Sequence, residues 1–148
     1  MRAADFARVP ATGQYLWAMD TDRIAAFPDF ANIPAAELNE LAGAMSEAEV
    51  DAGATVVRID EYGTAIYLIE AGNADVLDDR GDVIRALGPG DTFGEVGLLL
   101  TTQRIATVVA RTPMRLLSLS GQDFDRIRPH VPEVERSLRR LGIQRSGQ

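Results

Sequence analysis

The sequence predicts a mainly β protein with flanking helices, in which an antiparallel sandwich or barrel occupies the middle of the chain. Two observations lead to this fold class. Helical periodicity is confined to the two sides of a central region, and that region, about residues 50–119, holds short β-branched segments separated by glycine. The segments are ATVVRI, AIYLIE, ADVLDD, DVIRAL, RIATVVA and MRLLSL. Regular short strands with glycine-rich turns are typical of antiparallel sandwiches and barrels.

Composition narrows the classes of protein. The chain has 148 residues, a net charge of -7 and no cysteine, which fits one domain without disulfides or a cysteine-based metal site. Its apolar runs are too short to span a bilayer, and its first residues lack an apolar signal core. We therefore expect a soluble, cytoplasmic protein. The acidic balance argues against nucleic acid as a partner, because a phosphate-binding surface needs clustered Lys and Arg.

The first predicted helix covers residues 35–46. Leu38, Leu41, Ala42 and Met45 lie at helical spacing, and Pro34 suits the first helical position. This pattern indicates a short amphipathic helix that precedes the strands.

Turn and capping signals mark the later elements. Arg80 and Gly81 lie between two strand-like segments and predict a hairpin turn. Ser120, with Asp123 three residues later, predicts the start of a helix after the last strand. Pro129 then ends or interrupts that helix.

A final helix is predicted from Pro132 to Leu141. Gly142 suits the position after its end. Val134, Leu138 and Leu141 form a narrow apolar stripe on an otherwise charged helix, and such a stripe must pack on another surface. We expect residues 142–148 to be a frayed tail.

The segment GDTFGEVGLLLTTQRIATVVA, residues 90–110, carries the chemistry. Gly94 and Gly97 flank Glu95 and leave the backbone N–H groups unhindered, as in main-chain anion sites. An ionised Glu95 accepts hydrogen bonds from hydroxyl groups, and Arg104 offers a fork of donors that matches a phosphate. From spacing alone, an exposed Glu95–Arg104 ion pair and simple turn glycines explain the pattern equally well.

The sequence LGPGDTFGEVGLLLTTQRIATV resembles the phosphate-binding cassette of the cyclic nucleotide-binding domain family, as in the catabolite activator and protein kinase A regulatory subunits. AFPDFANIPAAELNELAGAM, DAGATVVRIDEYGTAIYLIEAGNADV and MRLLSLSGQDFDRI resemble its opening helical segment, early β-roll and last strand with the following helix. The resemblance implies an antiparallel eight-stranded β-roll (jelly roll) with an N-terminal helical segment and C-terminal lid helices. It divides the chain into an N-terminal arm (1–23), a binding domain (24–141, with the roll at about 50–119 and helices at about 121–141) and the tail.

The resemblance also assigns roles. Glu95 would bind the ribose 2′-hydroxyl, helped by the Gly94 amide. Arg104 would hold the exocyclic phosphate oxygens, with the amides of Gly97 and Ile105, and the helix 132–141 would be a lid over the base. The implied ligand-binding residues are Gly94, Glu95, Val96, Gly97, Arg104, Ile105 and Ala106, and the implied lid residues are Leu138 and Leu141.

Ile105 departs from the family pattern, which usually has Ala, Ser or Thr at this position. Isoleucine has no hydroxyl to pair with the guanine amino group, so we expect cAMP to be preferred over cGMP. Its bulk also leaves open an alternative, in which the domain has kept the fold, lost its ligand and become a protein interaction domain.

An enzyme is not expected. The chain has one histidine, His130, outside the strands, and no visible pair of nucleophile and base, so neither a metal-dependent nor a nucleophilic site is predicted. We expect no metal and no cofactor besides the nucleotide. The predicted function is a stand-alone cyclic nucleotide sensor whose lid helix closes on the ligand. Its output would pass to an effector protein, to a homodimer partner or to an output domain missing from this sequence.

Overall fold

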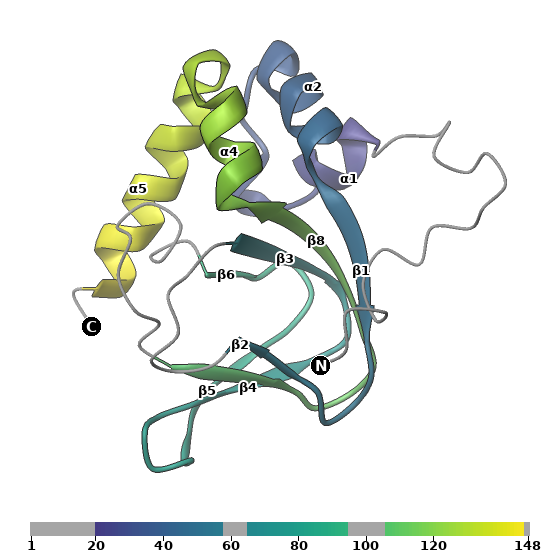
Figure 1. Ribbon diagram of the computed structural model, residues 1–148, viewed down its shortest axis with the longest axis vertical. Coiled ribbons are helices and arrows are strands. Elements are labelled where there is room, and N and C mark those ends of the chain that lie inside the picture. Colours follow the sequence, from purple (N-terminus) through teal and green to yellow (C-terminus); the bar gives the residue numbers. More distant parts are fainter. Residues whose placement is uncertain (1–19, 58–64, 95–105, 147–148) are drawn as a thin grey trace, which may run out of the picture.

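The computed structural model describes residues 20–57, 65–94 and 106–146, and the side chains as far as residue 140. Two sheets face each other, and the helices gather over one side of them (Figure 1). None of the described helices is both long enough and apolar enough to cross a membrane. The helical elements are α1 (Thr21–Ala25), η3 (Pro28–Phe30), α2 (Ala35–Ala44), α4 (Gly121–Ile127), η4 (Arg128–His130) and α5 (Pro132–Ser146).

The described strands number eight and form two four-stranded sheets, with the orders β1-β8-β3-β6 and β2-β7-β4-β5. Every strand pair is antiparallel. The predicted fold class is confirmed. The strands are β1 (Ser46–Val50), β2 (Thr55–Val57), β3 (Ala65–Ala71), β4 (Ala74–Leu77), β5 (Val83–Leu87), β6 (Thr92–Phe93), β7 (Thr107–Ala110) and β8 (Met114–Ser120).

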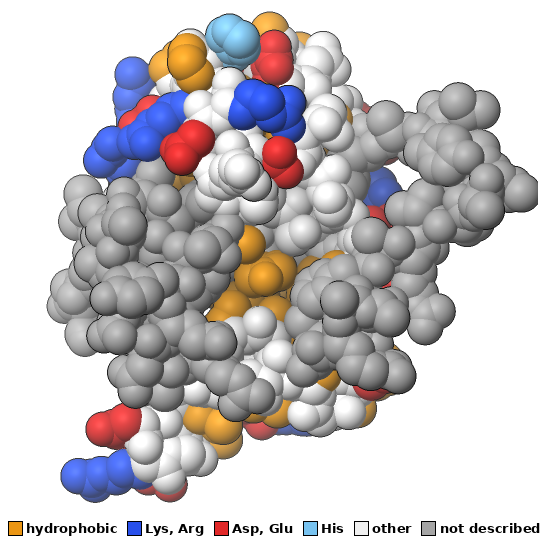
Figure 2. Space-filling view, in the orientation of Figure 1, with side chains coloured by type: hydrophobic (Ala, Val, Ile, Leu, Met, Phe, Trp, Pro, Cys, Tyr) orange, Lys and Arg blue, Asp and Glu red, His pale blue; other side chains and the backbone are white. Residues whose placement is uncertain are grey.

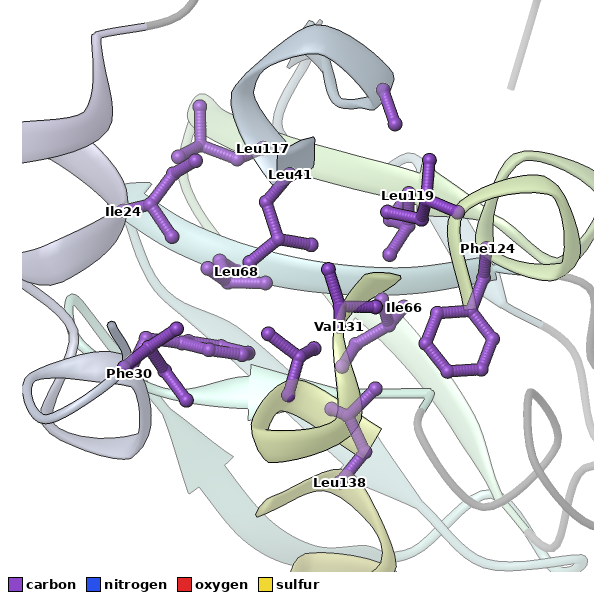
Figure 3. Close-up of a cluster of buried hydrophobic side chains, with 14 of the residues drawn as sticks. Ile24, Phe30, Leu41, Ile66, Leu68, Leu117, Leu119, Phe124, Val131 and Leu138 are labelled. Carbon is purple, nitrogen blue, oxygen red and sulfur yellow. The ribbon is translucent and has the colours of Figure 1, made fainter. Parts of the chain in front are cut away.

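The sheet that contains β3 and β8 is covered on both faces. Leu68 and Leu117 pack in a cluster with the helices, shown in Figure 3, whereas Ile69 and Leu116 pack in a second cluster inside the roll. All four side chains are fully buried. Burial on both faces explains why β8 reads as a nearly continuous apolar run rather than as strict alternation.

Local signals for turns and caps are confirmed. Gly81 has a positive φ of 85° at the tip of the β4–β5 hairpin, where its N–H donates to the Asp78 carbonyl. The Ser120 side chain accepts a hydrogen bond from the Asp123 amide at 3.1 Å and caps α4. α4 then gives way to η4, which contains Pro129.

Three predicted boundaries are wrong. The roll begins at Ser46 rather than near 50, since β1 alternates Glu47 and Glu49 with inward Ala48 and Val50, and a small Ala gives a weak strand signal. The first predicted helix, 35–46, ends at Ala44, because Ser46 already pairs with Ser118 in the first sheet. The last helix continues through Gly142 to Ser146, because one glycine costs a helix only about 1 kcal/mol.

Candidate functional site

The segment that carries the predicted phosphate-binding residues begins in one sheet and ends in the other. β6 pairs with β3 in the first sheet, and Gly94 follows it directly. Ala106 precedes β7, which pairs with β2 and β4 in the second sheet. The structure therefore places both ends of the candidate site. The predicted residues Glu95, Val96, Gly97, Arg104 and Ile105 lie outside the described residues, and their roles stay predictions.

Gly94 has the backbone conformation that favours glycine. Its φ is 94°, a left-handed region that side chains with a Cβ rarely adopt. The preceding Phe93 is buried inside the roll and stacks on Tyr67, with ring centroids 5.1 Å apart. The cassette segment thus begins at a glycine turn that directly follows a buried aromatic residue.

The strand that leads into Gly94 is bonded to the helical layer. Thr92 is fully buried, and its Oγ1 donates to Oδ2 of Asp29 in η3 at 3.2 Å. Pro28, also in η3, lies near the turn that precedes β6, because a Cβ added to Gly90 would come within 4.0 Å of the Pro28 ring. η3 in turn packs against α5. Sequence reasoning missed this link, which joins residues far apart in the chain.

One face of the molecule offers apolar surface among the residues that the structure describes. Figure 2 shows hydrophobic side chains at the bottom of a hollow near the centre of one face. Ala106 is half-buried and packs against the apolar cluster inside the roll. Within the described residues, no group of three or more His, Asp or Glu side chains could hold a metal ion. Such surroundings suit an organic ligand with an apolar part.

The N-terminal half of α5 belongs to the core of the helical layer. Val131, which precedes α5, and Val134 and Leu138 on the helix are all 0% exposed, and they pack with Phe30 and Leu41 (Figure 3). Burial of three such side chains contributes roughly 5–9 kcal/mol. The predicted lid residue Leu138 is therefore a core residue here. The side chain of the other, Leu141, lies outside the described part.

The start of α5 is capped from another helix. Glu37 of α2 is 7% exposed, and its Oε1 accepts hydrogen bonds from the backbone N–H groups of Glu133 at 2.9 Å and Val134 at 3.0 Å. Val131, which precedes the helix, has no side-chain acceptor, so these amides need an outside partner. The sequence contained a partial signal. Glu37 stands three residues after Pro34, where a capping-box glutamate finds no N–H because proline lacks one.

A charged cluster joins η4, which follows α4, to α5. Glu135 accepts hydrogen bonds from Arg128 at 2.7 Å and from Arg139 at 2.7 Å. Mainly the Arg128 bond, and then the Arg139 bond, lower the pKa of Glu135 to about 2. The Arg128 guanidinium also lies 5.4 Å from the centre of the Phe124 ring. The carboxylate therefore stays ionised and ties α5 to the preceding helix.

Comparison with known sequences agrees with the resemblance stated above. The profile of the family described as "Cyclic nucleotide-binding domain" matches residues 47–129, more than half of the chain. A cyclic nucleotide-gated potassium channel of Mesorhizobium japonicum is 35% identical over 124 residues, which cover 84% of this chain and 34% of the channel. A cAMP-dependent protein kinase regulatory subunit of Yarrowia lipolytica is 37% identical over 101 residues, 68% of this chain and 27% of the subunit. The chain spans about a third of these relatives.

Solved structures share the fold. The regulatory domain of Toxoplasma gondii protein kinase A with cAMP has a TM-score of 0.75 at 22% identity, and the match covers 86% of this chain and 49% of that one. The regulatory subunit of a cAMP-independent protein kinase A from Trypanosoma brucei has a TM-score of 0.71 at 24% identity, with 90% and 45% covered. The resemblance predicted from the cassette residues is confirmed.

Proposed function

The chain belongs to the cyclic nucleotide-binding domain family, and we propose that it binds cAMP, in preference to cGMP, at residues 94–106. The observation that carries this proposal is the segment itself. It holds the Gly-Glu and Arg of a phosphate-binding cassette, and it runs from the left-handed Gly94 at the end of β6 to Ala106 before β7. The matched family region, residues 47–129, includes the whole segment.

In the proposed complex, sugar and phosphate are recognised by opposite charges. The Glu95 carboxylate accepts a hydrogen bond from the ribose 2′-hydroxyl, beside the Gly94 amide. The Arg104 guanidinium donates to the exocyclic phosphate oxygens, and the amides of Gly97 and Ile105 complete the anion site. A charge-assisted hydrogen bond of this kind contributes about 1.5–3 kcal/mol.

Ile105 supports the preference for cAMP. Its side chain has no hydroxyl to pair with the amino group that distinguishes guanine from adenine. Relatives at 31–37% identity are named as cAMP-dependent protein kinase regulatory subunits, which agrees with this preference.

A second candidate function is a ligand-free interaction domain. The bulk of Ile105 favours it, and the Trypanosoma brucei structure with the same fold is described as belonging to a cAMP-independent kinase. The retained Glu95 and Arg104 favour the first proposal, because an interaction domain has no need for both at cassette spacing.

The proposed role is regulatory rather than enzymatic. Ligand binding would close the part of α5 beyond Leu138 over the base, because the helix before that point is built into the core. The signal would then pass to an effector protein, a second copy or a further domain. The relatives include a potassium channel and kinase regulatory subunits.

Equilibrium dialysis with radiolabelled cAMP tests the location of the site, with protein that has been unfolded and refolded to remove bound nucleotide. Arg104→Ala should weaken binding at least tenfold, because it removes the only charged donors proposed for the phosphate. Arg111→Ala is the matched control, since Arg111 is exposed, follows the end of β7 and is paired with Asp75. Equal affinities of the two variants would refute the proposed site.

A further inference from the structure

We propose that Glu37 is a positioning residue that fixes α5 on α2 and through α5 sets the affinity for the nucleotide. This inference rests on the proposed function. Glu37 lies outside the cassette, on α2 before the strands, whereas the proposed lid helix α5 follows the strands. The carboxylate reaches α5 because Pro34, at the start of its own helix, has no N–H to offer it.

The contact is specific in geometry. One carboxylate oxygen receives two amides in succession, Glu133 and Val134, at 2.9 and 3.0 Å. Two bonds from consecutive residues fix the direction of the helix axis as well as the place where the helix starts. The negative charge also lies at the positive end of the α5 dipole, which favours the same arrangement.

The position of α5 affects the nucleotide site, because α5 packs on η3, and η3 is hydrogen-bonded to β6, the strand that leads into the cassette. η3 lies against α5, and its Asp29 accepts a hydrogen bond from Thr92, two residues before Gly94. From its fixed start, α5 runs away from the helical layer alongside the roll (Figure 1). A small change of angle at Glu133 therefore becomes a large displacement at the far end of this 15-residue helix.

Without the cap, the packing of Val131, Val134 and Leu138 alone would hold the start of α5, and a smaller fraction of molecules would hold the closing part of the helix at the correct angle. The apparent dissociation constant rises as that fraction falls. Nucleotide should therefore bind more weakly and dissociate faster, since interactions completed after encounter act mainly on the dissociation rate.

The test compares variants by two measurements, cAMP affinity with its dissociation rate and amide hydrogen exchange in α5. Glu37→Ala should weaken cAMP binding at least fivefold and accelerate exchange at the Glu133 and Val134 amides. Glu37→Gln keeps an acceptor oxygen and should therefore retain part of the cAMP affinity and part of the exchange protection at these amides. Glu40→Ala is the matched control, because Glu40 lies on the same helix with an exposed side chain 3.6 Å from His130.

A stability control separates positioning from general weakening. Gly53→Ala strains the left-handed turn between β1 and β2, and at a temperature where all variants are folded it should leave cAMP affinity within twofold of wild type. If Glu37→Ala binds cAMP as tightly as Glu40→Ala does, the inference is wrong and the proposed function stands. If refolded wild-type protein binds neither cAMP nor cGMP, the proposed function fails, and the affinity role of Glu37 fails with it.

Discussion

Two glycines with left-handed backbone conformations, Gly53 and Gly72, differ in how closely other atoms approach them. Gly72 and Gly53 have nearly the same left-handed φ, 93° and 89°. A Cβ on Gly53 would meet nothing within 4 Å, whereas one on Gly72 would overlap the carbonyl oxygen of Pro113 and come within 2.8 Å of the Met114 Cα. Gly53 therefore serves only to make a turn possible, whereas Gly72 also allows two backbone segments to come into contact.

This pair isolates the effect of close approach. Gly53→Ala should lower the free energy of unfolding by about 1–2 kcal/mol, the cost of a left-handed L-residue. Gly72→Ala should lower it by at least about 2 kcal/mol more, because backbone atoms must move apart. Urea denaturation of both variants measures the difference. Equal destabilisation would show that the contact at Met114 yields easily.

For single residues, the sequence predicts some roles and not others. Gly94 could be singled out because its neighbours form a cassette pattern, whereas its left-handed φ of 94° was not predicted and is known only from the structure. The Glu37 cap could not be predicted, because a free carboxylate at a helix start does not reveal which distant amides it will meet. Thr92 and Asp29 are likewise 63 residues apart, and only the fold brings them together.

At the scale of elements, α5 is held by its first two turns. A complete switch of a two-state element requires about 5.5 kcal/mol of differential ligand affinity. Removing Val131, Val134 and Leu138 from the core would cost roughly 5–9 kcal/mol before the loss of the Glu37 bonds. A nucleotide could not readily drive this helix away from the helical layer as a whole, so movement is expected beyond Leu138.

The Glu135 cluster makes the α4–α5 junction sensitive to acid. The pKa of Glu135 is about 2 in the folded protein, against 4.5 for the unperturbed group. The lowered pKa means that its contribution to stability is complete above about pH 4.5 and is lost as the pH falls towards 2.

Glu135→Gln should therefore destabilise the protein by about 1–2 kcal/mol at pH 7, since the remaining exposure of the carboxylate screens the pair. The difference from wild type should shrink steadily between pH 4.5 and pH 2. Urea denaturation across this range measures it, with Asp125→Asn as a control, because Asp125 lies 3.8 Å from Arg128 and is largely exposed. A difference that stays constant down to pH 2 would contradict the assigned ion pairs.

Elements with strong periodicity could be predicted, and weak ones could not. The helix at α2 and the hairpin at Gly81 follow from local patterns. β6 was missed because two residues are too few to show alternation, and β1 because polar residues occupy three of its five positions. Gly142 suits a helix end in the sequence, but α5 continues through it, because a glycine terminates a helix where it adopts a left-handed conformation, which sequence does not reveal.

The whole molecule is acidic, with a net charge of -7, and the proposed ligand is an anion. Long-range electrostatics therefore oppose the encounter, and affinity must come from close contacts that salt screens less. This supports a binding segment in which one arginine and backbone amides surround the phosphate. The chain spans about a third or less of the curated relatives it matches.

The most direct test of nucleotide binding is a calorimetric titration of the refolded protein with cAMP and then with cGMP. We predict one cAMP per chain with a dissociation constant near micromolar, about -8 kcal/mol, and weaker binding of cGMP. No heat with either nucleotide, from protein whose circular dichroism shows it to be folded, would contradict the proposed function and favour a ligand-free interaction domain.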